Sequence, residues 1–532
     1  MSTGDPQNTS ESAPALLRSS AIVGSMTMMS RVLGLVRDIV IAGFVGASAN
    51  ADAFFVAFKI PNFLRRLFAE GAFAQAFVPV LADYKEDGSV AAVKALLNRV
   101  AGVLGGALLL LTGIMILAAP IVTAIFAPGF VSHPAKYALT AELIRITFPY
   151  LLLISMTGLC GAILNSYGRF AVPALTPIFL NLSLIGAATV AAPWFDEPVF
   201  ALAWGVFLAG VIQLLFQLPS LYRLDLVPRP IWDTRDAGVR RILKLMVPAL
   251  FGVSVSQINL LLDTVIASFL PTGSVSWLYY SDRLTELPLG VFGIAIATVI
   301  LPSLSAHNAA SRAGQFTRTL DWAVRNVLLI AMPAAVALIL LAEPILITLF
   351  QYGALTPGDV DMASLSLRAY SLGLAAFMLI KVLAPGFYAR KDMMTPVSIG
   401  IKAMVANMVL NLLFVLPLYF YFNIGHVGLA LATSASAYLN AGLLLRGLMK
   451  EQVFRFQPGW ALFIFRLLAS TLAMVVAVLL LTPGNEQWLA WGWQHRALQI
   501  VLVCAAGIAS YGLTHIALGT RMHHLRSPAG SD

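Results

Sequence analysis

Residues 103–126 read VLGGALLLLTGIMILAAPIVTAIF and carry no charged side chain. A run of roughly 18 or more apolar residues is long enough to cross the hydrocarbon layer of a bilayer as a helix. The motif LAAPI at 117–121 returns as LAEPI at 341–345, a shift of 224 residues. The stretch therefore predicts a membrane helix that occurs twice in one chain.

The composition of the whole chain is that of a membrane protein. Of 532 residues, 59% are hydrophobic and 11% are charged, whereas soluble globular chains are about half apolar and a quarter charged. This balance excludes a disordered protein, a nucleic-acid-binding arm and nearly every soluble enzyme. In a soluble protein the formal charge of +9 would suggest nucleic acid. Here we attribute it to cytoplasmic loops and expect no nucleic-acid partner.

The apolar runs predict an all-α polytopic membrane protein. At about 20 apolar residues per span the chain has room for a dozen or more helices, and we count about fourteen. Pro61 and Gly71 interrupt the second, and Pro288 and Gly290 the eighth, which indicates either a packing bend or backbone that lines a cavity. The predicted spans are 20–46, 52–84, 93–126, 138–167, 172–193, 199–221, 239–270, 274–304, 319–351, 362–389, 395–422, 426–449, 459–482 and 496–518.

The distribution of Lys and Arg predicts the orientation. With the N-terminus inside, about twenty of these residues fall in cytoplasmic segments, where membrane proteins concentrate them. The outer loops keep only Lys136 and Arg496. Residues 1–19 precede a helix with internal charge, so we do not interpret this region as a cleavable signal peptide. We therefore expect both termini in the cytoplasm, in agreement with an even number of spans.

An internal repeat divides the chain into two lobes. Other matches have offsets of 223 to 225 residues: Asp38 with Asp263, Pro79 with Pro302, Arg145 with Arg368, and Pro173 with Pro396. Six spans per repeat give both copies one orientation, related by a pseudo-twofold axis along the membrane normal, as in transporters that rock two lobes about a central site. The predicted parts are a cytoplasmic tail at 1–19, an N-terminal lobe at 20–221, a cytoplasmic linker at 222–238, a C-terminal lobe at 239–450, and the last two helices with a tail at 451–532.

Charged residues inside the predicted spans mark a candidate substrate site. Ionisable side chains in membrane helices are costly, so they mostly face a cavity or one another. Arginines outnumber the nearby acids here, and a guanidinium matches phosphate oxygens, so the pattern predicts a cationic cavity for phosphate or pyrophosphate. The candidates are Arg31 and Arg37 in the first span, Asp52, Arg65 and Arg66 in the second, and Asp282, Arg283 and Glu286 in the eighth.

Two structural interpretations compete with that site. Arg37 with Asp52, or Arg283 with Glu286 at a helical spacing of three, would form internal salt bridges. The adjacent arginines of the second span would lie near a membrane end and extend their charge into the interface.

A second polar set lies in the C-terminal lobe. Its oxygen atoms suit a hard cation such as Na⁺, although asparagines in spans also form hydrogen bonds between helices. Cys160 and Cys504 form no metal motif, and no Walker sequence for ATP hydrolysis occurs. We therefore expect a transporter, not an enzyme, with no required cofactor. The candidate Na⁺ ligands are Asp263, Asn407, Asn411 and Thr433.

Several motifs are long and specific. They read SRVLG at 30–34, DAFFVAFKIPN at 52–62, RRLFAEGAF at 65–73, YSDR at 280–283 and VLAPGFY at 382–388. Together they closely resemble the MurJ (MviN) family, the lipid II flippases of bacterial peptidoglycan synthesis, over essentially the whole chain. The resemblance implies the MOP exporter fold, with a hydrophobic groove at helices 13 and 14 and an alternating-access cycle. It also implies lipid II as substrate, the bacterial inner membrane as location, and cell-wall synthesis proteins as candidate partners.

The resemblance implies roles for single residues. In the family an acid at the position of Asp52 pairs with an arginine at that of Arg37 and gates the cavity, which positions matching Ser276 and Glu286 also face. Some members hold Na⁺ at positions matching the oxygen set, with an acid where this chain has Asn411. Because of that departure, membrane potential is an alternative driving force. Cavity arginines of the family that bind pyrophosphate match Arg31, Arg37, Arg65 and Arg283.

Three other functions fit parts of the pattern. A drug exporter of the same superfamily would present acids to a cation, not an excess of arginines. A flippase for another undecaprenyl-linked oligosaccharide would bind the same pyrophosphate, so charge alone does not separate it from the first interpretation. An integral-membrane glycosyltransferase would need a large acidic outer loop, and no predicted outer loop is long enough.

Overall fold

The computed structural model describes residues 13–86, 89–310 and 312–520, which form helices joined by short loops, with no strand among them. The first twelve residues of the predicted tail and residues 521–532 lie outside the described part. The chain forms two compact units. Unit 1 comprises Met1–Ile41, Ala57–Val122 and Ala138–Val253, and unit 2 comprises Ala42–Val56, Thr123–Tyr137 and Ser254–Asp532.

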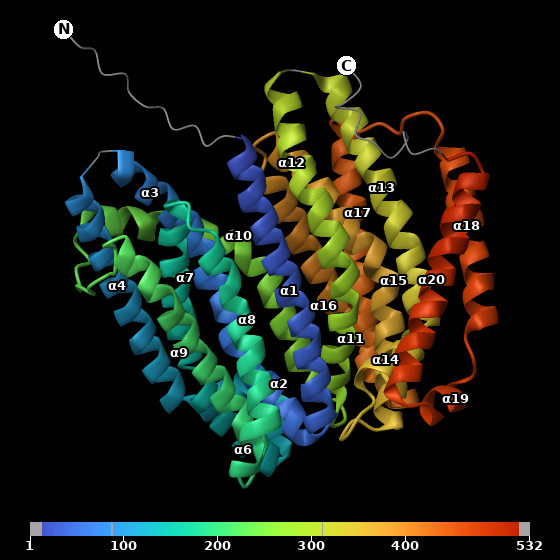
Figure 1. Ribbon diagram of the computed structural model, residues 1–532, viewed down its shortest axis with the longest axis horizontal. Helices are drawn as coiled ribbons and strands as arrows, with labels where there is room; N and C mark the ends of the chain where they lie inside the picture. Colours follow the sequence, from blue (N-terminus) through green and yellow to red (C-terminus); the bar gives the residue numbers. More distant parts are fainter. Residues whose placement is uncertain (1–12, 87–88, 311, 521–532) are drawn as a thin grey trace. The chain divides into compact units, whose positions relative to one another are not determined.

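Unit 1 packs around α7, which contacts α3, α4, α8 and α9 (Figure 1). Its core buries aromatic and branched side chains such as Phe77, Val100 and Leu164. Small residues let the helices approach closely: a Cβ on Gly210 would lie 2.9 Å from the Tyr150 ring. Some helices of the first half of the chain belong partly to unit 2, as the unit bounds show. The helix bounds in that half are α1 (Ala13–Val45), α2 (Ala49–Arg65), η1 (Arg66–Phe73), α3 (Ala74–Glu86), α4 (Val90–Leu117), α5 (Ala119–Phe126), α6 (Pro134–Thr147), α7 (Tyr150–Ser166), α8 (Ala171–Gly186), η3 (Ala187–Ala191), α9 (Val199–Arg223) and α10 (Ala237–Ala267).

Unit 2 packs around α15 and α17, which contact each other, and α13 and α16 lie against them. Helix α15 begins with a capping box, in which the Thr356 hydroxyl and the Asp359 carboxylate bond each other's backbone N–H groups. The pair α18 and α20 lies side by side, with α13 against α18 (Figure 1). The bounds are α11 (Ser274–Pro288), η5 (Leu289–Gly293), α12 (Ile294–Ala309), α13 (Ala313–Leu340), α14 (Ala342–Phe350), α15 (Pro357–Tyr388), α16 (Met394–Phe422), α17 (Gly425–Lys450), α18 (Trp460–Leu481), α19 (Asn485–Ala490) and α20 (Trp493–Ala517).

Ten helices of the described residues are long and apolar enough to cross a membrane, which confirms an all-helical, multi-pass membrane protein. The remaining predicted spans correspond to α1, α2–α3, α10 and α11–α12, whose sequences carry the internal charges or are interrupted by η1 and η5. Charged residues and helix interruptions lower the mean hydropathy or the uninterrupted length of such segments, and these four are not among the ten candidate spans. The count of fourteen and the arrangement of the lobes therefore stay predictions.

The same helix irregularities occur in both copies of the sequence repeat. Helix α4 gives way to α5 at Ala118 (φ −88°, ψ 12°), and α13 gives way to α14 at Leu341 (φ −99°, ψ 14°). The π-helical turns η1 and η5 begin at Arg66 and Leu289, again 223 residues apart. The expected interruptions of the second and eighth spans are thus confirmed, and π-helical turns often occur at functional sites.

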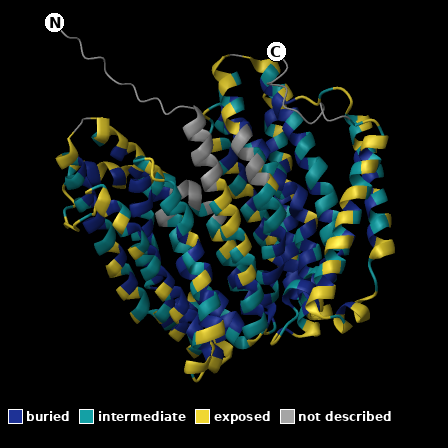
Figure 2. Cartoon of the chain, viewed as in Figure 1, coloured by how far each residue is buried: buried dark blue, intermediate teal, exposed yellow. Residues whose placement is uncertain are grey.

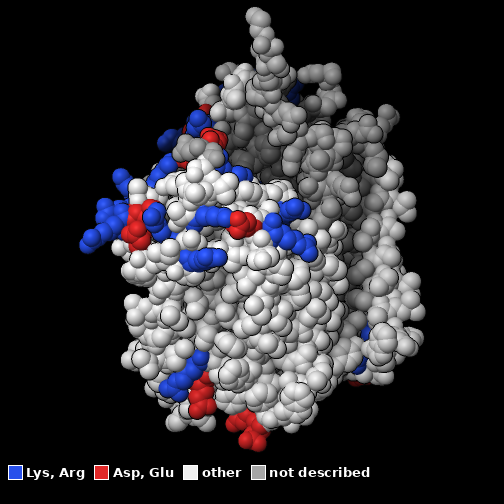
Figure 3. All heavy atoms as spheres, turned by 60° about the vertical axis from the view of Figure 1, so that its left-hand side comes forward, with Lys and Arg blue, Asp and Glu red and all other residues white. Residues whose placement is uncertain are grey.

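The surface separates charged from apolar regions. Figure 2 shows many exposed residues along α18 and α20, and these include apolar side chains such as Leu472, Val476 and Ile508. Figure 3 shows Lys and Arg gathered toward one end of a face that is otherwise mostly uncharged. Such a band is the expected pattern for a protein with one heavily basic membrane end.

Candidate functional site

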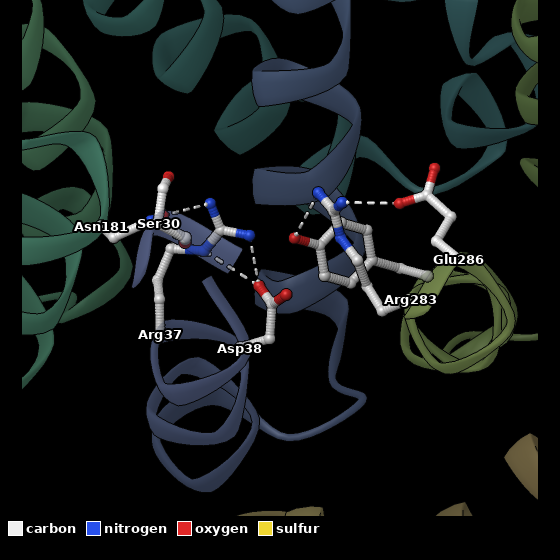
Figure 4. A network of polar contacts seen from close by, with 7 residues as sticks. Ser30, Arg37, Asp38, Asn181, Arg283 and Glu286 are labelled. Atoms are coloured by element: carbon white, nitrogen blue, oxygen red, sulfur yellow. Dashed lines mark hydrogen bonds and ion pairs between the residues drawn. The ribbon is translucent and has the colours of Figure 1, made fainter. Parts of the chain in front are cut away.

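Arg37 and Asp38 form a buried ion pair on α1. Nε and Nη2 of Arg37 lie 2.9 and 2.6 Å from Oδ1 of Asp38. Nη1 donates to Oδ1 of Asn181 on α8 at 3.0 Å, and Asn181 donates to the Ser30 carbonyl (Figure 4). An acid and an amide therefore hold the guanidinium in one orientation. Asn181 is absent from the predicted set, although it is the one asparagine of the apolar helix α8.

Arg31 and Arg65 line neighbouring cavities within unit 1. Arg31 lines a cavity of about 390 Å³ between α1 and α8, and Arg65 lines one of about 610 Å³ bounded by α7, α8 and α9. Both cavities share four lining residues, so they are contiguous. Arg65 also donates from Nε to Oδ1 of Asn62 at 3.1 Å, whereas Arg66 is exposed and lines neither cavity. The shared residues are Asn165, Phe170, Pro173 and Pro177.

Two glutamines of α9 line the larger cavity. Nε2 of Gln213 donates to the Thr176 carbonyl at 3.0 Å, and Nε2 of Gln217 donates to the Thr176 hydroxyl at 2.9 Å. Both Oε1 atoms are buried and lack a hydrogen-bond partner among the described residues. The lining of the cavity thus includes an arginine donor and two glutamines, whose acceptor oxygens are enclosed in the cavity wall. Neither glutamine was predicted, but amides four residues apart in an apolar span are a recognisable signal.

Arg283 pairs with Glu286 on α11 of unit 2. Its Nη1 lies 3.0 Å from Oε2 of Glu286, as the spacing of three predicted (Figure 4). The guanidinium also lies over the Tyr279 ring at 5.0 Å, and that ring stacks on Phe55 with centroids 4.0 Å apart. The pair is half-exposed, and Asp282 beside it is exposed.

Asp52 lies at the centre of a buried polar cluster in unit 2. Its side chain is 1% exposed, and its Oδ2 accepts from Lys136 Nζ at 2.8 Å. The same oxygen accepts from the Gly273 N–H at 2.8 Å, while Oδ1 accepts from the Ser276 N–H at 3.0 Å and its hydroxyl at 2.7 Å. Lys136 also lies over the Phe130 ring at 4.1 Å. Every oxygen of this buried carboxylate is therefore matched.

The position of Asp52 follows from the start of α11. The first N–H groups of a helix lack intrahelical partners and carry partial positive charge, so they bind an anion. Gly273 provides no side-chain cap of its own, and the carboxylate from α2 takes that place. Gly273 has φ +99°, and a Cβ there would lie 2.7 Å from the Trp277 ring, so this close turn favours glycine.

Lys136 and Arg496 lie in helices and not in loops as expected, while their position on the outer side of the membrane stays a prediction. Lys136 lies in the first turn of α6 and Arg496 in that of α20, and they are 7% and 6% exposed. Arg496 donates to the carbonyls of Trp488 and Leu489 at 2.8 and 3.1 Å. The sequence places each charge near the end of an apolar run, but it does not reveal which other segments of the chain bury that charge.

The four candidate cation ligands come together in unit 2. Nδ2 of Asn411 donates to Oδ1 of Asp263 at 2.9 Å and to Oδ1 of Asn407 at 3.0 Å. The Thr433 hydroxyl lies 3.5 Å from Asp263 Oδ2 and from Asn407 Nδ2. Asn407 and Asn411 are 1% and 0% exposed. Residues from α10, α16 and α17 thus form one buried cluster.

The cluster has the chemistry of a site for a small cation. Oδ1 of Asn411 is buried without a hydrogen-bond partner among the described residues. A buried acceptor without a donor is costly, and a cation would satisfy it. In this structure the Nδ2 atom of Asn411, and not this oxygen, faces Asp263 and Asn407, so the Na⁺ site stays a prediction. The alternative interpretation, in which the asparagines form hydrogen bonds between helices, also agrees with the structure, because Asn407 and Asn411 both form such bonds.

The expected pairing of Arg37 with Asp52 stays a prediction. The partners given above for Arg37 are Asp38 and Asn181, and those of Asp52 are Lys136, Gly273 and Ser276. A single cavity lined by residues of both predicted lobes also stays a prediction.

Comparison with known proteins places the chain in a family. The sequence profile described as lipid II flippase MurJ matches residues 41–493. The chain belongs to the MurJ family. Among curated MurJ proteins, the probable lipid II flippase of Vibrio cholerae serotype O1 is 50% identical over 519 residues, with 96% of this chain and 98% of the relative covered. The lipid II flippase MurJ of Burkholderia cenocepacia is 43% identical, with 86% and 89% covered.

Solved structures agree with membership of the MurJ family. The structure titled lipid II flippase MurJ, inward closed conformation, has a TM-score of 0.78 at 26% identity and covers 94% of this chain and 99% of its own. An inward-facing multidrug resistance MATE transporter of the MOP superfamily has a TM-score of 0.65 at 16% identity, over 81% of this chain and 97% of its own. The second likeness concerns the fold alone, and it agrees with the expected MOP exporter fold.

Proposed function

We propose that this protein moves lipid II from the cytoplasmic to the periplasmic leaflet of the bacterial inner membrane. The observation that carries the proposal is the arginine-lined cavity of unit 1 in a chain of the MurJ family. Lipid II joins an undecaprenyl chain to a disaccharide peptide through a pyrophosphate. Arg31 and Arg65 would bind that pyrophosphate, because guanidinium groups form paired, charge-assisted hydrogen bonds with phosphate oxygens.

Gln213 and Gln217 support a polar headgroup beside the pyrophosphate. Both side chains line the cavity, and their Oε1 atoms are enclosed in its wall without donors among the described residues. Turned toward the cavity, these oxygens would accept from sugar hydroxyls or peptide N–H groups. Leaving such acceptors unmatched costs about 1–3 kcal/mol each. A headgroup with donors is therefore favoured over an apolar drug in this cavity.

Arg37 and Arg283 would take part by exchanging partners. Each is matched to a carboxylate, Asp38 at 2.6 Å and Glu286 at 3.0 Å. A pyrophosphate carries more negative charge and more acceptor oxygens than a carboxylate, so it competes for the same donors. A ligand shifts the equilibrium between two conformations only if it binds one of them more tightly. Pyrophosphate would do so if it bound more tightly to the conformation in which Asp38 and Glu286 have released the arginines.

The cycle that we propose alternates access between two lobes, at 20–221 and 239–450, within fourteen spans and with both termini cytoplasmic. The three arginines of the linker at 222–238 support this orientation, because the positive-inside rule counts Lys and Arg rather than net charge. Exposed apolar side chains on α18 and α20 support a groove for the lipid chain. Cell-wall synthesis proteins that make or consume lipid II are the proposed partners.

Na⁺ is a proposed ligand rather than a required cofactor. Asp263, Asn407, Asn411 and Thr433 would hold it, and it would supply positive charge that offsets the Asp263 carboxylate. The grouping of these four side chains in one buried cluster supports this assignment. Membrane potential remains the alternative driving force, because Asn411 is an amide where the family pattern has an acid.

Depletion of the protein in its own cells tests the proposed function. We expect lipid II to accumulate on the cytoplasmic leaflet while other undecaprenyl-linked oligosaccharides stay at normal levels. Re-expression of the wild-type chain should restore lipid II on the outer leaflet. Accumulation of a different undecaprenyl-linked oligosaccharide, with lipid II unchanged, would contradict the proposal and identify the other flippase class.

A further inference from the structure

Arg466 is the one charged residue of α18, between Trp460 and Leu481, and α18 is among the most apolar candidate spans of the described residues. A charge inside a membrane helix is costly unless it is matched. Nε of Arg466 is buried and has no hydrogen-bond partner among the described residues. One donor of the guanidinium is therefore left unmatched by the described part of the chain.

Arg466 lines a pocket of about 480 Å³ at one end of three neighbouring helices. We call it the α13–α18–α20 pocket. Arg318 lies near the start of α13, Gly459 precedes the start of α18, and Thr520 follows the end of α20. These helices are candidate membrane spans, so the pocket lies where the spans meet a membrane surface. Further lining residues are Asp321, Trp322, Arg325, Asn326, Phe463 and His515.

The one acid among the lining residues is already matched. Asp321 lies 2.8 Å from Nε of Arg325 and accepts from the Trp460 indole N–H at 2.7 Å. Arg325 also donates to the carbonyls of Gln457 and Pro458 at 3.0 and 3.1 Å. Asp321 and Arg325 thus form a neutral connection between α13 and the loop before α18. The charges left in the pocket are those of Arg318 and Arg466, both positive.

The pocket changes from charged to apolar along α13. Arg318, Trp322, Arg325 and Leu329 follow one another at helical spacings of four, three and four, so they share one face. Arg318 is nearest the helix start, and Leu329 is about 16 Å further along it. Leu329 lies with Leu462 and Phe463 among the apolar lining residues. A phosphate group with an attached acyl chain matches this gradient.

We propose that the α13–α18–α20 pocket binds the phosphodiester headgroup of an anionic phospholipid. Basic pockets between membrane helices are typical sites for such headgroups, and two arginines bind phosphate more specifically than ammonium groups do. The site is separate from the cavities of unit 1 and does not depend on the proposed transport function. It would fix the ends of α18 and α20 to the lipid surface.

A second use of Arg466 is to stabilise the end of α20 by itself. A Cβ on Gly519 would lie 3.0 Å from its Nη2 atom, so the guanidinium lies beside the last turn, whose carbonyls favour positive charge. The carbonyls of Thr514, His515 and Ile516 already accept backbone N–H groups. A purely capping arginine would stabilise the protein equally in neutral and anionic lipid.

Lipid binding by the purified full-length chain distinguishes a phospholipid site from an Arg466 that only caps α20. The chain in neutral detergent with phosphatidylcholine is titrated with phosphatidylglycerol, and bound lipid is counted by native mass spectrometry alongside the melting temperature. We expect phosphatidylglycerol to raise the melting temperature of the wild type. Arg466→Gln should weaken its binding at least about tenfold, as expected for a lost charge-assisted hydrogen bond.

Arg446→Gln is the matched control, because this α17 arginine is exposed and does not line the pocket. It should retain wild-type binding. If Arg466→Gln does not fold, Arg318→Gln takes its place, since Arg318 is exposed and its loss should weaken binding severalfold. Equal phosphatidylglycerol binding by the wild type and the pocket variants overturns the proposal. Inorganic phosphate is the second probe: if it displaces phosphatidylglycerol and raises the melting temperature equally, the site binds free phosphate and the lipid assignment fails.

Discussion

The charged residues within the helices of this protein are of two kinds. Arg37 and Asp52 are almost fully buried, and each is bound by partners from more than one helix. Arg31 and Arg65 instead line cavities in unit 1. Buried charges that are paired with partners on other helices stabilise one arrangement of those helices. Arginines that line a cavity are accessible to a ligand. Substitutions should therefore affect stability at the first kind and transport at the second, with Arg37 contributing to both.

Arg37→Ala should abolish growth complementation while the protein still reaches the membrane. The variant loses a guanidinium that makes charge-assisted hydrogen bonds worth about 1.5–3 kcal/mol each. It also leaves Asp38 buried, so Asp38→Asn in the same chain should restore protein level but not growth. Arg37→Lys should complement partly at best, because lysine lacks the fork. Full complementation by Arg37→Ala at normal expression contradicts this role.

Lys136→Gln should destabilise the protein strongly without removing any group from the predicted substrate site. It leaves the Asp52 carboxylate buried without its cation, which typically costs about 3–5 kcal/mol. The melting temperature of the purified chain measures the effect, and Lys450→Gln at an exposed position is the control. Asp52→Asn together with Lys136→Gln should recover part of the loss, as a double-mutant cycle would reveal. Additive losses in that cycle would mean that the two side chains do not interact.

At the scale of single elements, α11 differs from a long candidate span such as α4 in how it begins and continues. Helix α11 begins at a left-handed glycine, is capped by an acid from α2, and passes into π-helical turns at Leu289. Helix α4 has none of these features and begins with an ordinary Ser89 cap. Helix α11 carries Ser276, Arg283 and Glu286 of the candidate site, so backbone changes there should have larger effects than changes in α4.

Gly273→Ala should destabilise the start of α11. A left-handed conformation costs an L-residue roughly 1–2 kcal/mol, and the new Cβ would also lie 2.7 Å from Trp277 and 3.0 Å from the Ala47 carbonyl. Gly442→Ala is the control, because its Cβ would meet nothing within 4 Å in the middle of α17 and alanine favours a helix by about 1 kcal/mol. The midpoint temperature of thermal unfolding should be lower for Gly273→Ala than for the wild type. It should be unchanged or higher for Gly442→Ala. Equal midpoints would rule out the proposed strain at Gly273.

At the scale of the whole molecule, orientation follows from charge. A reporter that is active only in the periplasm should stay inactive when fused after Arg526 and become active when inserted near Glu197. Cytoplasmic segments retain basic residues, and Lys136 and Arg496, the two apparent exceptions, are buried and bound. The reverse activity pattern would overturn both the orientation and the even number of spans.

Transport should respond to membrane potential even if the Asp263 cluster has no role in coupling. Moving one elementary charge through 100 mV is worth about 2.3 kcal/mol. A net displacement of one charge would thus shift a two-state equilibrium about fiftyfold. Exposure of lipid II on the outer leaflet is followed while an ionophore collapses the potential at fixed Na⁺, and then while Na⁺ varies at fixed potential. Exposure that ignores potential and follows Na⁺ alone would assign the coupling to Asp263, Asn407 and Asn411.

The sequence by itself determined the helical membrane class, the approximate helix bounds and the family. It also located the interruptions at η1 and η5 and the pairing of Arg283 with Glu286. These features are local: the length of an apolar run, a proline or glycine within it, and a spacing of three on one helix are all properties of neighbouring residues. The four candidate oxygen ligands from α10, α16 and α17 were also identified, from their oxygen chemistry and from the spacing of four between Asn407 and Asn411.

Only the tertiary structure decided how the buried charges are matched. Asp52 binds Lys136, 84 residues away, and Ser276, 224 residues away, and Arg37 binds Asn181, 144 residues away. Several donors in the sequence could satisfy each charge, and the choice depends on which helix faces pack together. An apolar pattern specifies that a face is buried but not which face it meets. Hydrogen bonds within about 3 Å distinguish between partners that the pattern leaves equivalent.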